Sequence, residues 1–114
     1  MKEIFVFGSN QAGRHGLGSA LHAYKFWGAI KGVGEGIQGR SYGIPTKDEK
    51  LVSRSLPDIE RSVKLFIEYA TAHPELAFKV VRIGCGLAGK KEKDIAPMFA
   101  TAPSNCLLPK GWRV

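Results

Sequence analysis

One local order occurs twice in this chain and constrains its fold more than any other feature: an apolar run, a glycine-rich segment, then a helix. Residues 4–7 are a continuous run of β-forming side chains, and glycines recur from Gly8 to Gly18 before a helical pattern at 19–30. Residues 78–83 form a second β-rich run, which ends in Gly-Cys-Gly-Leu-Ala-Gly at 84–89. Strands buried on both faces of a parallel sheet produce such runs.

The remaining segments continue the alternation of strands and helices. Residues 41–45 and 105–108 predict short strands, and residues 94–100 predict a short helix. Between them lies an apolar stripe at helical spacing, made of Ile59, Val63, Phe66, Ile67 and Ala70. The order β-α-β-α-β-α-β predicts a three-layer α/β/α domain with a mostly parallel central sheet, spanning residues 1–114 as one domain.

Turn and capping residues place the ends of the long helix. Ser55 with Asp58 resembles a capping box, and Pro57 suits the first helical turn. His73 followed by Pro74 predicts its end.

Length and composition favour one small globular domain. The 114 residues are 44% hydrophobic and 24% charged, and no apolar run approaches the roughly 20 residues of a membrane span. The start of the chain is too short for a signal peptide, so we expect a soluble cytoplasmic protein that does not bind membranes. Cys85 and Cys106 are too few for a disulfide scaffold or a metal site. We expect no metal and no cofactor, and Cys85 is interpreted as a small buried side chain rather than a reactive thiol.

A net charge of +7 points to partners that carry phosphate, such as nucleotides or nucleic acid. Lys90, Lys91 and Lys93 form the densest group of charges. A run of this kind is more typical of a solvated face than of a binding site.

The two glycine-rich segments predict the binding site. Each follows a strand and precedes a helix, so both should project from the carboxyl edge of the sheet, where ligands of open α/β folds bind. Their backbone amides can hold anions, and glycine lets the backbone approach a phosphate closely. Neither segment is a P-loop or a G-x-G-x-x-G fingerprint. We predict a diphosphate gripped between them, with ligand contacts from Ser9, Asn10, Gly13, Gly16, Gly18, Gly84, Cys85, Gly86, Leu87, Ala88 and Gly89.

Residues 80–87, Val-Val-Arg-Ile-Gly-Cys-Gly-Leu, resemble the second phosphate loop of macro domains. The resemblance is closest to the branch of terminal ADP-ribose protein glycohydrolase and the DNA ADP-ribosyl glycohydrolase antitoxins, which also has Thr-Lys at a strand end before a long helix, as at Thr46-Lys47 here. Phe-Gly-Ser-Asn at 7–10 is similar to small phage-associated macro-like proteins. The resemblance covers about residues 4–99. It implies a macro-like fold that binds ADP-ribose or an ADP-ribosylated macromolecule.

The same resemblance implies that Lys47 is a catalytic nucleophile. The matching lysine attacks the anomeric carbon of the distal ribose, which it can do only in its neutral form. The alternative is a solvated lysine held charged by Asp48 and Glu49. The chain has Ala88 where the branch's hydrolase has an aspartate, and it starts too late for the extra first strand of typical macro domains, whose aspartate reads adenine. Glu35 and Asp48 are the acids considered as replacements.

Three functions therefore stay open: an ADP-ribosyl glycohydrolase, a non-catalytic reader or sequesterer of an ADP-ribose-like nucleotide, and a basic nucleic-acid-associated accessory protein.

Several side chains near the first glycine-rich segment have two interpretations. Asn10 and Ser9 either bind a ribose hydroxyl or cap local backbone. Arg14 and His15 either contact phosphate or face solvent as loop charges. Three aromatic residues are interpreted as core rather than as a base-stacking surface: Tyr24, Phe26 and Trp27.

Overall fold

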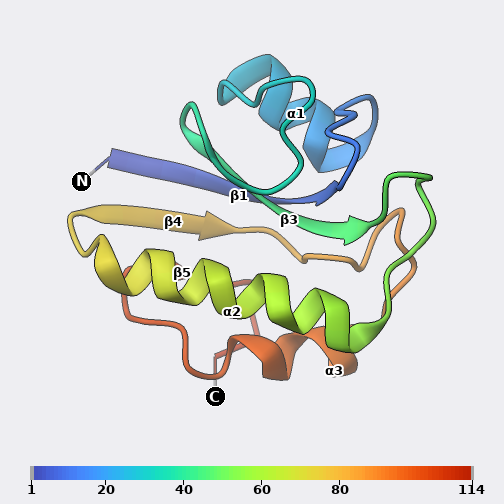
Figure 1. Ribbon diagram of the computed structural model, residues 1–114. Coiled ribbons are helices and arrows are strands. Elements are labelled where there is room, and N and C mark those ends of the chain that lie inside the picture. Colours follow the sequence, from blue (N-terminus) through green and yellow to red (C-terminus); the bar gives the residue numbers. More distant parts are fainter. Residues whose placement is uncertain (1, 114) are drawn as a thin grey trace.

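The computed structural model describes residues 2–113 and has a five-stranded sheet with helices on both faces (Figure 1). The strands lie in the order β2-β3-β1-β4-β5. β3 (Ser41–Lys47) and β4 (Leu76–Val80) each pair in parallel with the central β1 (Lys2–Asn10). β5 (Cys106–Leu107) pairs in parallel with β4, and β2 (Gly36–Gln38) is antiparallel to β3. The predicted α/β fold with a mostly parallel sheet is confirmed.

The helices form two layers. α1 (Gly18–Phe26) lies on one face of the sheet, and α2 (Leu56–Ala72) and α3 (Glu92–Ile95) lie on the other (Figure 1). A 3₁₀ helix, η1 (Ala96–Phe99), continues directly from α3. Among residues 2–113, no helix is both long and apolar enough to cross a lipid bilayer.

Alternate side chains of β1 pack into two separate hydrophobic clusters, one on each face of the sheet. Ile4 and Val6 pack with the α2 side, where the largest cluster lies, while Phe5 and Phe7 pack with the α1 side. All four side chains are buried. The continuous apolar run therefore has the cause predicted for it, which is a central strand covered on both faces.

The long helix begins and ends where its sequence signals predict. The Ser55 hydroxyl accepts a hydrogen bond from the Asp58 amide at 3.3 Å, and Pro57 lies in the first turn. The helix ends at Ala72, before His73. Asn105 then stabilises this end, because its side-chain nitrogen lies 3.1 Å from each of three carbonyl oxygens, those of Ala70, His73 and Leu76.

Other boundaries differ from the prediction for local reasons. α1 ends at Phe26 rather than at residue 30, because Gly28 has a φ of +75° and turns the chain. β4 ends at Val80 rather than at residue 83, where the Ile83 amide bonds back to the Val81 carbonyl. β2 was not predicted, since its three residues lie in a glycine-rich stretch.

The short third helix begins two residues earlier than predicted, at Glu92, and becomes a 3₁₀ helix at Ala96. Two of the aromatic residues interpreted as core are exposed instead, Tyr24 and Phe26. Trp27 is half-buried and stacks on Phe5 with ring centroids 5.4 Å apart.

Candidate functional site: a cleft between two glycine-rich loops

The carboxyl ends of β1, β3 and β4 open into a cleft of about 740 Å³. This volume is within the range of small-molecule sites. Its floor includes Gly8, Ser9 and Asn10 at the end of β1, and a β-bulge between Ser9 and Asn10 sets Asn10 opposite Lys47. All the predicted site residues line this cleft except Gly13 and Gly89: Ser9, Asn10, Gly16, Gly18, Lys47, Gly84, Cys85, Gly86, Leu87 and Ala88.

The two glycine-rich loops meet across this cleft. Leu87 of the second loop reaches the start of α1, where its Cδ1 lies 3.4 Å from the position that a Cβ on Gly18 would occupy. The side chain of Leu87 is nonetheless 64% exposed, and Leu17 and Leu51 form further exposed apolar surface on the lining. These leucines make part of the rim apolar.

Several backbone amides along the lining have no internal acceptor. In the part of the chain that the structure describes, this holds for Gly86, Leu87 and Ala88 of the second loop. It holds also for the first turn of α1, which has no side-chain cap at Leu17. Other amides of the second loop bond within it, because the Cys85 amide donates to the Arg82 carbonyl and the Gly89 amide donates to the Gly86 carbonyl. Both loops thus offer free donors to an anion at one cleft.

Asn10 and Ser9 line the cleft, and the side chain of each bonds to a backbone atom. The Asn10 amide group donates to the Arg14 carbonyl at 2.8 Å and accepts from the Arg14 amide at 2.9 Å. The Ser9 hydroxyl donates to the Gly34 carbonyl. The Asn10 bonds match its capping interpretation and fix the shape of the first loop. The Ser9 bond is not a local cap, because Gly34 lies 25 residues further along the chain.

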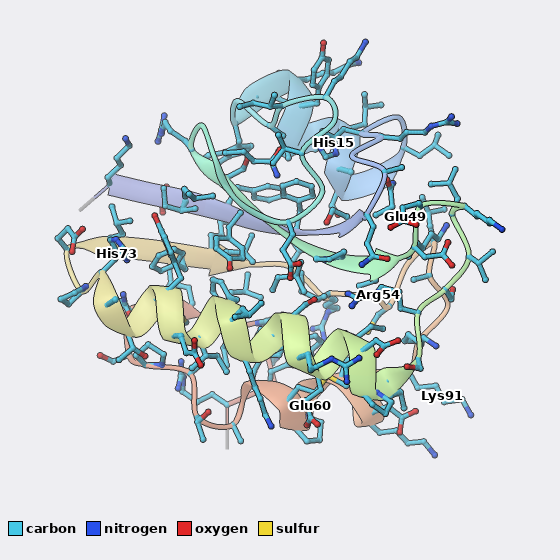
Figure 2. All side chains as sticks on the ribbon, in the orientation of Figure 1. His15, Glu49, Arg54, Glu60, His73 and Lys91 are labelled. Carbon is cyan, nitrogen blue, oxygen red and sulfur yellow. The ribbon has the colours of Figure 1, made fainter. Side chains whose placement is uncertain are left out.

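Arg14 and His15 have different environments although they are adjacent. Arg14 is exposed and lines the cleft. His15 is only 5% exposed and does not line it, so both of its sequence interpretations were wrong. Figure 2 shows His15 on the α1 side of the sheet, where its ring packs against Phe7. Its Nε2 lies 2.9 Å from the Ile30 carbonyl oxygen and 3.2 Å from Oε1 of Gln38. His15 therefore anchors the first loop to the segment between α1 and β3.

Gly13 is a structural glycine rather than a ligand contact, which corrects its predicted role. It is buried away from the cleft against Gly32, whose amide donates to the Gly13 carbonyl at 2.9 Å. A Cβ on Gly13 would lie 2.3 Å from the Gly32 carbonyl carbon. Gly89 likewise does not line the cleft; it closes the second loop with a φ of +72°.

Lys47 lies half-buried at the cleft, at the end of β3. Among residues 2–113, it forms no ion pair with a carboxylate. The neighbouring Asp48 carboxylate accepts instead from the amides of Lys50 and Val52, at 2.8 and 3.0 Å, and so stabilises its own turn. The Asp48 carboxylate therefore forms no ion pair with Lys47.

The acid that lines the cleft is Glu92, which sequence reasoning did not single out. It accepts hydrogen bonds from the Arg82 guanidinium and, at 2.8 Å, from the Trp112 indole nitrogen. Glu35 and Asp48, the acids considered from the sequence, do not line the cleft. The sequence does mark Glu92 as the one acid between Lys90 and Lys93, but this pattern does not indicate that its side chain lies at the cleft.

Cys85 lines the cleft as a protonated thiol. Burial and the charge of Glu92 raise its pKa, and Arg82 opposes them. Its Sγ lies 3.4 Å from the Ile83 carbonyl oxygen. The thiolate needed for nucleophilic chemistry is thus disfavoured. Within residues 2–113, no three His, Cys, Asp or Glu side chains are grouped to hold a metal ion.

Comparison with known proteins supports the fold but does not indicate a function. The chain is similar to a protein of unknown function from Bacteroides thetaiotaomicron. The match covers 85% of this chain and 77% of that one, with 19% identity and a TM-score of 0.60. No family model and no curated protein matches the chain.

Proposed function

We propose that this protein binds ADP-ribose or a closely related ADP-ribosyl nucleotide, with the diphosphate between the two glycine-rich loops. The observation that carries the proposal is the set of free amides from both loops on one cleft. Amides at a helix start and in a glycine-rich turn bind phosphate oxygens without a fixed charge.

The charge and shape of the cleft support an anionic ligand with an apolar part. Arg14 and Lys47 line it without a carboxylate partner among residues 2–113, and the charge of Arg82 is paired with Glu92. The exposed leucines of the rim suit the face of a nucleobase. A cleft of about 740 Å³ has room for a nucleotide of this size.

Titration calorimetry with ADP-ribose, with ATP and NAD as comparison ligands, tests this proposal. A matched pair of variants isolates one amide, because a Cβ on Gly86 meets no atom within 4 Å. Gly86→Ala keeps the amide, whereas Gly86→Pro removes its hydrogen. We expect Gly86→Pro to bind ADP-ribose about 10- to 100-fold more weakly than Gly86→Ala, the value of a hydrogen bond to a charged group. Absence of ADP-ribose binding by the wild type, or equal binding by both variants, would refute the proposal.

The position of Lys47 favours a further chemical role at the same site. We propose that the protein releases ADP-ribose from a modified macromolecule. The neutral Lys47 amine attacks the anomeric carbon of the distal ribose, the glycosidic bond to the macromolecule breaks, and the macromolecule leaves with the proton that the amine gives up. Water then hydrolyses the lysine adduct and frees ADP-ribose. Its freedom from the Asp48 carboxylate supports this role. Lys47→Ala is expected to abolish turnover of ADP-ribosylated DNA or protein while ADP-ribose binding largely survives. Unchanged turnover in that variant would remove the mechanism, and wild-type binding without product would leave a non-catalytic reader.

A competition experiment between free ADP-ribose and DNA separates the binding and hydrolytic functions from a nucleic-acid-associated role. If DNA binds with an affinity that falls steeply with salt and free ADP-ribose does not displace it, the basic surface acts independently of the cleft.

A further inference from the structure

Glu92 is a carboxylate fixed from one side only. The Arg82 guanidinium and the Trp112 indole nitrogen both donate to the same oxygen, Oε1. Within residues 2–113, no donor reaches the second oxygen, Oε2. The carboxylate is therefore oriented while one acceptor stays free.

The support for Glu92 is buried on the Trp112 side and exposed on the Arg82 side, where the Arg82 and Glu92 side chains are 46% and 51% exposed. Trp112 is 3% exposed and packs on Phe99 with ring centroids 5.5 Å apart. Arg82 also lies 3.4 Å from the Lys110 carbonyl oxygen, through its second terminal nitrogen. A positioned acceptor of this kind loses little conformational entropy when a ligand donates to it.

Glu92 and Lys47 lie on opposite sides of the cleft floor. Lys47 ends β3 and Arg82 follows β4, and β1 lies between these two strands in the sheet. Glu92 and Lys47 both line the cleft. A diphosphate held over the end of β1 would thus direct one sugar toward Lys47 and the other toward Glu92.

We propose that Glu92 recognises a free ribose diol, that of the adenosine half of the nucleotide, and so selects against nucleotides phosphorylated there. This inference rests on the proposed function. Carboxylates in dinucleotide sites accept hydrogen bonds from ribose hydroxyls, and a phosphate at that position would face a like charge. The oxygen Oε2 takes the hydroxyl hydrogens while Arg82 and Trp112 hold Oε1.

The experiment compares ADP-ribose with 2′-phospho-ADP-ribose by calorimetry on the full chain. Glu92→Gln keeps the shape and removes the charge. Glu75→Gln is the matched control, because Glu75 is exposed just before β4, at the end of that strand away from Arg82. We expect the wild type and Glu75→Gln to bind ADP-ribose at least about tenfold more tightly than the 2′-phosphate, and Glu92→Gln to lose most of this ratio.

Trp112→Phe tests the positioning of the carboxylate. It retains an aromatic ring against Phe99 but removes the donor to Oε1, so the affinity ratio should fall although Glu92 is intact. Circular dichroism on each variant shows that it is folded.

The outcomes distinguish this inference from the proposed function. A wild type that binds neither nucleotide would refute the proposed function. If it binds ADP-ribose and Glu92→Gln leaves the ratio unchanged, only the role of Glu92 is refuted. A wild-type preference for the 2′-phosphate would assign that contact to Arg82 and also overturn the inference.

Discussion

Replacing Gly13 with alanine should destabilise the protein strongly, because two separate costs fall on one residue. Its φ of +70° is left-handed, which costs an alanine about 1–2 kcal/mol. The new Cβ would also lie 2.3 Å from the Gly32 carbonyl carbon and 2.5 Å from the Val33 nitrogen. These are backbone atoms that cannot rotate away, and overpacking typically costs about 1–3 kcal/mol. We expect a total loss of about 2–5 kcal/mol.

Two other glycines separate these costs. Gly34→Ala places a Cβ 2.2 Å from the Asn10 carbonyl oxygen without a left-handed φ, so only the overlap applies. Gly16→Ala meets no atom within 4 Å and has no left-handed φ, so its stability should change by less than about 0.5 kcal/mol.

Thermal unfolding followed by circular dichroism measures the series. For a domain of this size, the expected loss at Gly13 lowers Tm by roughly 8–20 °C. Gly34→Ala should fall between the other two variants. If Gly13→Ala and Gly16→Ala unfold at the same temperature, the close packing of the first loop against residues 32–33 is wrong.

Three further predictions follow from single side chains. Iodoacetamide should modify Cys85 slowly at pH 8, because burial and the charge of Glu92 raise the pKa of its thiol. Saturating ADP-ribose should slow the modification further, because Cys85 lines the cleft. Mass spectrometry measures the modification with Cys85→Ser as the control, and absence of protection by ADP-ribose would place the ligand elsewhere. Burial, with Glu35 adding to it, raises the pKa of Tyr42 from 10.0 to about 12, so the folded state keeps the proton longer than the unfolded state. The Tyr42 contribution to stability is therefore full below pH 10 and is lost between pH 10 and 12, by up to about 1.4 kcal/mol per pH unit. Urea unfolding at pH 9 and pH 11 should show that the free energy of unfolding falls less with pH in Tyr42→Phe than in the wild type. An equal fall in both proteins would contradict this. Asn105→Ala should cost about 1–3 kcal/mol in urea unfolding, because it removes the donor shared by three carbonyl oxygens at the end of α2; a loss below about 0.5 kcal/mol would show that water replaces it.

The sequence predicts the sheet well where local signals coincide with long-range packing. The run at residues 4–7 identifies the central strand, and Ser55 with Pro57 identifies the start of α2, because each signal has one physical cause. β2 pairs with β3 as a hairpin whose two-residue turn is Gly39-Arg40, with a φ of +60° at Gly39. This signal is local, but the glycines at 32, 34 and 36 obscure it, because they give the whole segment the composition of a loop.

The loops of the candidate site were predictable, as were Ser9, Asn10 and Lys47 in its lining, but the positions of His15 and Glu92 were not. The position of glycines after strands indicates the cleft, because the carboxyl ends of parallel strands share one edge. The burial of His15 depends on Ile30 and Gln38, which no local pattern connects to it. The placement of Glu92 depends on Trp112, twenty residues later, and is equally invisible to a reading along the chain.

The floor of the cleft belongs to the central strand of the sheet, with a parallel neighbour on each side. Amides in such a strand exchange with solvent mainly through global opening, whereas loop amides exchange through local fluctuations. A ligand on this floor binds the native state but not a state in which the sheet has opened. Its binding free energy should therefore slow deuterium uptake across β1, far beyond the residues that it touches.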